Sequence, residues 1–106
     1  MGEEKWSVTV NATGTRVQDP GGEVAEISWE DTLGIFIETN DSGPLGMDVI
    51  WLVAGENGSI MFPMGAQGEG AALQYFQSLP GFNNKQVIQA MSCSENQTFE
   101  VWRKAP

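Results

Sequence analysis

The chain has 106 residues, 41% of them hydrophobic, which predicts one domain (residues 1–106) with a single core. Its 14 acidic and 5 basic residues give a net charge of −9, which argues against a nucleic-acid backbone or an anionic membrane as partner. The excess charge lies in residues 1–56, where Lys5 and Arg16 are the only bases, whereas residues 57–106 are balanced. This acidic half is either a solvated face or a docking face for a basic partner.

No basic segment followed by an apolar run opens the sequence. The longest apolar run, residues 49–54, is too short to span a bilayer. Cys93 is the single cysteine, so an internal disulfide cannot form. We therefore expect a cytoplasmic protein that is not inserted in a membrane.

Alternating apolar and polar residues predict four strands in the first third of the chain. Proline and glycines in residues 19–22 give a strong turn signal between the second and third strands. In the fourth strand, Leu33, Ile35 and Ile37 are expected on one face and Phe36 on the other. The four predicted strands are residues 6–11, 15–18, 23–29 and 33–38.

Residues 49–53 are apolar on both faces, which predicts a central strand covered by the core on one side and by helices on the other. Asn57-Gly58 is a hairpin signal that leads into a return strand at residues 59–63. Pro63 predicts a strand end or a sheet edge. Residues 98–103 alternate again and predict a final strand.

Residues 66–91 read as two consecutive helices. In the first helix, Ala72, Leu73, Phe76 and Leu79 form an apolar stripe at helical spacing. Pro80-Gly81 ends this helix, because proline lacks an N–H donor and glycine tolerates a left-handed turn.

Asn83 is a suitable N-cap for the second helix, and Gln86 three positions later matches a capping box. Val87, Ile88 and Met91 are expected to face inward together.

Together these elements predict an α+β protein with a mostly antiparallel sheet or a partly open barrel of about six to seven strands. Two consecutive C-terminal helices and a final strand complete it. The expected core comprises Val8, Ile27, Ile35, Ile37, Val49, Trp51, Val53, Ile60, Phe62, Leu73, Phe76, Phe82, Val87, Ile88 and Phe99.

The segment 27–31 (Ile-Ser-Trp-Glu-Asp), the following Ile35-Phe36-Ile37, and the strand 60–63 that runs into a helix resemble the pleckstrin-homology-like domains of small bacterial proteins. The resemblance implies a barrel closed by a helix. This chain departs from it by continuing with a second helix and a strand.

A second set of features spans most of the chain: Glu38-Thr39, Gly43-Pro44, Asp48, Trp51, the segments 79–82 and 87–91, Phe99 and Trp102. In these features the sequence resembles a group of uncharacterised small bacterial proteins. That resemblance implies a bacterial source and supplies no activity.

Catalytic groups are scarce. The chain has no histidine, which removes the commonest general base and zinc ligand, and it has no P-loop or G-x-S-x-G motif. Cys93 has no histidine to activate it, so a packed or idle thiol is expected. Gly65, Gly68 and Gly70 at a helix start indicate turn chemistry in place of an anion site. We therefore expect a protein that is not an enzyme, has no cofactor and has no dedicated metal site.

The leading hypothesis is a non-enzymatic interaction module whose acidic first half docks a basic protein, with an inhibitor or immunity protein for a toxin as one form. The candidate partner-binding residues are Glu23, Glu26, Trp29, Glu30 and Asp31. Tryptophans are enriched at binding hot spots, although core burial is the alternative for Trp29. A homodimer through a strand edge or an exposed tryptophan is also expected.

The alternative function is binding of a small ligand or cation by the loop 38–48. Glu38, Asp41 and Asp48 offer carboxylates of the kind that bind calcium, but their order does not match an EF-hand.

Overall fold

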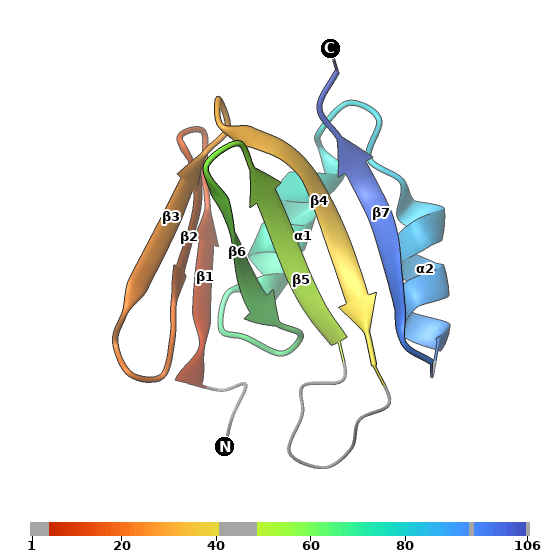
Figure 1. The fold of residues 1–106 in the computed structure, drawn as a ribbon, viewed down its shortest axis with the longest axis horizontal. Helices are drawn as coiled ribbons and strands as arrows, with labels where there is room; N and C mark the ends of the chain where they lie inside the picture. Colours follow the sequence, from red (N-terminus) through yellow and green to blue (C-terminus); the bar gives the residue numbers. More distant parts are fainter. Residues whose placement is uncertain (1–4, 41–48, 94, 106) are drawn as a thin grey trace.

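The computed structural model describes residues 5–40, 49–93 and 95–105. In this part of the chain, seven strands form two antiparallel sheets, and two consecutive helices precede the last strand (Figure 1). This confirms the predicted α+β class, the order of the elements and the mainly antiparallel pairing. None of the described helices is long and apolar enough to cross a membrane.

The first sheet has three strands in the order β1-β2-β3. The strands are β1 (Ser7–Val10), β2 (Gly14–Gln18) and β3 (Val24–Ser28). The turn between β2 and β3 follows its sequence signal: Asp19 accepts the Glu23 N–H through its carboxylate at 2.9 Å, and Gly22 takes a φ of 91°. Such a positive φ favours glycine, so this turn fixes the register of the hairpin locally.

The second sheet has four strands in the order β6-β5-β4-β7. The strands are β4 (Thr32–Thr39), β5 (Val49–Gly55), β6 (Gly58–Pro63) and β7 (Gln97–Arg103). β5 is a central strand and β6 ends at Pro63 on the sheet edge, as the sequence predicts. The β5–β6 hairpin also forms, although Gly58 pairs with Gly55 and the two-residue turn is Glu56-Asn57.

The prediction that helices cover the second face of β5 is wrong. Trp51 on β5 donates its indole N–H to Glu69 at the start of a helix, and its ring contacts Phe76 of the same helix. The helices therefore complete the core on one face of the four-stranded sheet, behind it in Figure 1. On the opposite row, Leu52 is half-buried and its cross-strand partner Met61 is 44% exposed. Apolarity on both faces of β5 thus reflects a core face and an open apolar face.

The helices are α1 (Glu69–Gln77) and α2 (Asn84–Ser92). The N-cap of α1 is Gly68, where a Cβ atom would overlap the Val8 carbonyl oxygen of β1, so a glycine is required there. The Asn83 side chain caps α2 by accepting the Gln86 N–H at 3.2 Å. The Asn83 N–H itself bonds the Val101 carbonyl at 2.7 Å, which ties the helix start to β7 instead of closing a reciprocal capping box.

Two predicted orientations on α2 are wrong. Ile88 is 66% exposed and Met91 is 42% exposed, while Val87 and Ala90 are buried. The second helix rests on β7 and β4 at one end of the sheet, so it buries only the narrow stripe at i and i+3. Ile88 lies about 100° around the helix from Val87 and falls outside that stripe.

Leu33 is also misplaced by simple alternation. A β-bulge between Thr32 and Gly34 shifts the register of β4 against β5. As a result Leu33 is 46% exposed, whereas Ile35 and Ile37 lie in the core as predicted. An extra residue in one strand inverts the faces on its far side, and alternation cannot show where it occurs.

One hydrophobic cluster joins both sheets and both helices. Trp51 stacks on Phe62 with ring centroids 6.0 Å apart and contacts Phe76 at 5.6 Å. Every predicted core residue except Ile88 is buried or half-buried. The structure adds Val17, Ala66, Ala72, Ala90 and Val101 to that core.

Candidate binding groove beside strand β3

The acidic residues named from the sequence gather along β3 and the turn that follows it. Glu23 precedes β3, Glu26 lies within it, and Glu30 and Asp31 form the β3–β4 turn, all with exposed side chains. Glu56 of the β5–β6 turn joins them, because its N–H donates to the Asp31 carbonyl at 3.0 Å. Residues from two hairpins therefore make one acidic corner.

Trp29 takes a different position from these acids. Its ring is half-buried, stacks on Tyr75 with centroids 5.8 Å apart, and meets Phe76 and Trp102 edge to face. Its indole N–H donates to the Asn11 carbonyl at 2.7 Å. These contacts agree with the alternative of core packing, and they hold the turn that carries Glu30 and Asp31.

All the tryptophans are at least half-buried in the described part of the chain. The expected homodimer would therefore have to use a strand edge instead of an exposed tryptophan. The homodimer itself stays a prediction.

A groove of about 600 Å³ lies where the three-stranded sheet meets the β5–β6 hairpin. Of the predicted residues, Glu26 and Asp31 line it. Most of its other lining residues are small and polar, among them Thr15, Ser28, Asn57 and Ser59, while Ile27 and Ile60 add apolar surface. A second hollow of about 230 Å³ shares Ser59 and Ile60 and reaches Glu23 and Val24. The two hollows together follow β3 along its length.

The β5–β6 hairpin approaches β3 closely because Gly55 has no side chain. A Cβ atom at Gly55 would overlap Ile27 Cδ1, so a larger residue would push the hairpin away. Ile27 is paired with Thr15 across the β2–β3 ladder, which places both side chains on the same face of the sheet. This approach brings the hairpin next to the part of the groove that Ile27 and Asp31 line.

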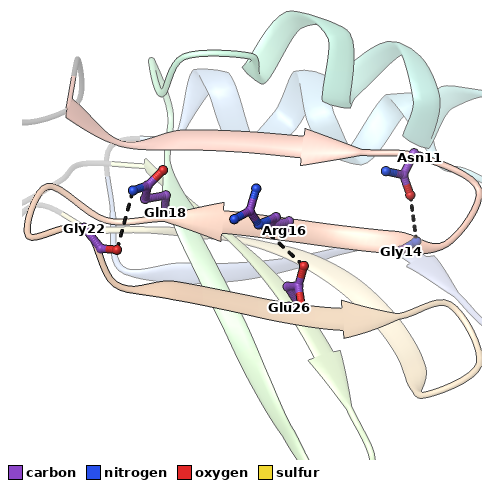
Figure 2. A network of polar contacts seen from close by, with 6 residues as sticks. All are labelled: Asn11, Gly14, Arg16, Gln18, Gly22 and Glu26. Atoms are coloured by element: carbon purple, nitrogen blue, oxygen red, sulfur yellow. Dashed lines mark hydrogen bonds and ion pairs between the residues drawn. The ribbon is translucent and has the colours of Figure 1, made fainter.

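The cations near the groove are few. Arg16 Nε lies 3.5 Å from Glu26 Oε2 across the β2–β3 ladder, with both side chains largely exposed. Figure 2 shows this pair with Asn11, Gln18 and their hydrogen-bonding partners on one face of the sheet. Lys104 Nζ donates to the Glu30 carbonyl at 2.7 Å and to the Trp29 carbonyl at 3.3 Å, so it supports the turn main chain. The carboxylates of Glu23, Glu30 and Asp31 lie outside both arrangements.

Thr15 is the feature that sequence reasoning missed. It is 2% exposed, and its hydroxyl is buried without a hydrogen-bond partner in the described structure. A buried unpaired hydroxyl is costly, and this one lines the groove. Alternation places Thr15 on the same strand face as the apolar Val17, so its burial could be read from the sequence. The lack of a hydrogen-bond partner could not, because it depends on packing between elements.

Neither the loop 38–48 nor Cys93 shows a binding site in the described residues. Glu38 is exposed on β4, and Asp41 and Asp48 lie outside the described residues, so cation binding by the loop 38–48 stays a prediction. Within residues 5–40, 49–93 and 95–105, no group of three or more acidic or cysteine side chains is placed to hold a metal ion. Cys93 is half-buried, with its sulfur 3.6 Å from the Thr39 hydroxyl.

The start of α1 is filled by its own carboxylate. Glu69 accepts the Gly65 N–H at 2.9 Å and the Trp51 indole N–H at 2.8 Å. This arrangement agrees with the structural interpretation of the nearby glycines.

Comparisons with protein-family models, curated proteins and solved structures found no match for this chain.

Proposed function

We propose that this protein is a non-enzymatic interaction module that docks a basic protein partner. The docking surface would be the acidic margin, which we define as Glu23, Glu26, Glu30 and Asp31. One observation carries the proposal: Glu26 and Asp31 line a groove that runs beside an exposed edge strand. The margin thus combines negative charge with a concave surface, which a merely solubilising distribution of charge does not require.

Exposed carboxylates act mainly at long range. Their field attracts a basic partner and raises the association rate, and salt screens it over a Debye length of about 8 Å at physiological ionic strength. An inhibitor or immunity protein that covers a basic toxin would use such a surface. The proposal places the module in a bacterial cytoplasm, where an unpaired thiol such as that of Cys93 stays reduced.

The experiment compares two double variants with the same change in charge. Glu23→Gln with Glu30→Gln removes two charges from the margin. Glu38→Gln with Glu95→Gln removes two exposed charges from other places, on β4 and after α2. Each protein is immobilised, and bound proteins are captured from a bacterial lysate at low and at high salt.

We expect the wild type and the control variant to retain the same basic proteins at low salt and to lose them at high salt. The margin variant should retain much less at low salt, because charged groups near a binding site set the encounter rate. Equal capture by the two variants, or capture that does not depend on salt, would contradict the proposal.

A further inference from the structure

The outer edge of β3 has main-chain groups that point away from its own sheet. Two hydrogen bonds bracket the β2–β3 ladder, from the Asp19 N–H to the Glu23 carbonyl and from the Trp29 N–H to the Thr13 carbonyl. Bonded and non-bonded pairs alternate along an antiparallel ladder. The pairing register therefore assigns the odd-numbered residues 23, 25, 27 and 29 to the bonds with β2.

The even-numbered residues of β3 must then direct their N–H and C=O groups outward. One of these groups is used, because the Ser28 carbonyl accepts the Thr32 hydroxyl at 2.6 Å. For Val24 and Glu26, the described part of the chain supplies no main-chain partner, and β3 is the last strand of its sheet. Figure 1 shows β3 at the margin of the molecule. Strand β6 packs close to β3 but forms no ladder with it. Such an edge can pair with an added strand.

The groove beside this edge suits a long cationic side chain. Ile27 and Ile60 offer apolar surface for the methylene stem, and Asp31 offers a carboxylate near the charged end. The buried hydroxyl of Thr15 has no partner and could accept a hydrogen bond from an ammonium or guanidinium group. The groove therefore offers apolar surface for the stem of a lysine or arginine side chain and polar groups for its charged end.

We propose that a basic partner docks as an extended segment that adds a strand to the outer edge of β3. Side chains alternate between the two faces of a strand, so every second residue of the segment would face the groove. Those residues would be arginine or lysine. This inference rests on the proposed function, and it adds the backbone conformation of the partner and the spacing of its charges.

Charge favours a basic segment over a second copy of this chain as the occupant. Two β3 edges paired with each other would bring Glu23 and Glu26 of one copy close to the same residues of the other, and opposed like charges destabilise a strand pair. Charged residues on an edge are a common protection against self-association. A basic strand would turn the same charges into attraction.

The probe is a short synthetic peptide in which arginine and threonine alternate, labelled for fluorescence anisotropy. Two isomers carry backbone N-methyl groups, one on the arginines and the other on the threonines. In an added strand, the N–H groups of alternate residues point toward β3 and the rest point away. Strand addition therefore predicts that one isomer binds at least about tenfold more weakly while the other binds like the parent peptide.

Protein variants test the same contact from the other side. Val24→Pro removes an outward N–H without changing the charge, and proline is tolerated at edge positions whose N–H faces solvent. It should weaken the parent peptide about tenfold, whereas the matched Val24→Ala should leave the affinity within about twofold. Thermal unfolding of both variants checks that the sheet is intact.

Thr15→Val removes the groove hydroxyl at nearly constant volume. It should weaken the peptide severalfold while the melting temperature of the free protein stays the same or rises, because the hydroxyl is unpaired in the free protein. A lower melting temperature with unchanged affinity would show that Thr15 is structural and would remove it from the site.

The outcomes separate this inference from the proposed function. If both N-methylated isomers bind like the parent, or Val24→Pro binds like Val24→Ala, strand addition is wrong. If the double variant Glu23→Gln with Glu30→Gln nevertheless loses peptide binding, docking through the acidic margin still holds. If that double variant binds the peptide like the wild type, the acidic margin itself fails.

Discussion

The two sheets differ in how much of each strand is buried. The four-stranded sheet supplies the large core residues Trp51, Phe62, Ile35 and Ile37, which are almost completely buried. The three-stranded sheet supplies only smaller buried side chains, and β3 exposes residues on both faces. The unpaired hydroxyl and the open edge belong to the three-stranded sheet, and the acidic margin lies on β3 and at its two ends. Stability and the proposed recognition therefore occupy different sheets.

This separation has a physical reason. A strand whose large side chains are buried has a fixed register, because a slip by one residue would expose those side chains. An edge strand with little buried surface can tolerate polar side chains and keep free main-chain groups, at a lower local stability.

Phe62→Ala should have the largest effect, lowering the free energy of unfolding by about 3–5 kcal/mol, because it removes a fully buried ring stacked on Trp51. The counterpart in the three-stranded sheet is Ile27→Ala, expected to cost about 1 kcal/mol because Ile27 is only half-buried. Urea unfolding measures both. Equal losses would show that the three-stranded sheet contributes as much to the core as its partner.

Substitutions at the junction between the two helices should cause the next largest loss of unfolding free energy. Phe82→Ala is expected to cost about 3 kcal/mol, because Phe82 packs against the core where α2 begins. Asn83→Ala should cost about 1 kcal/mol through loss of its N-cap. The sites are adjacent, so the double variant should differ from the sum of the single effects. A nearly silent Phe82→Ala in urea unfolding would mean that this junction does not support the four-stranded sheet.

Glu69→Ala should cost about 2 kcal/mol, because it leaves the Trp51 indole N–H without its acceptor at the interface between the sheet and α1. Glu69→Gln retains one acceptor oxygen and should cost less. Calorimetric melting of the two variants tests this order. If Gln were as harmful as Ala, the charge of Glu69 would matter more than the hydrogen bond.

Arg16→Ala should have the smallest effect on folding, under about 0.5 kcal/mol, because the Arg16–Glu26 pair is largely exposed. The same variant should tighten binding of the alternating arginine peptide, since it removes a competing cation from the groove. Anisotropy titrations and urea unfolding of one preparation measure both effects. Weaker peptide binding would instead make Arg16 part of the docking surface.

The local features of this protein can be predicted from short stretches of its sequence. Gly22, Pro80-Gly81 and Asn83 act within a few residues, through backbone conformation or a single hydrogen bond, and each forms the turn or cap predicted for it. Alternation likewise located the strands, because a half-buried strand repeats with a period of two. The element order and most of the core followed from these signals.

Which surfaces are covered depends on how the elements pack against one another. The bulge that exposes Leu33 depends on how β4 pairs with β5, and the exposure of Ile88 depends on where α2 rests against the sheet. The groove requires β3 and the β5–β6 hairpin to meet, and Thr15 becomes its buried unpaired hydroxyl through packing between elements distant in the sequence. Such contacts join residues that no local pattern links, so the candidate site became visible only when the two sheets were placed together.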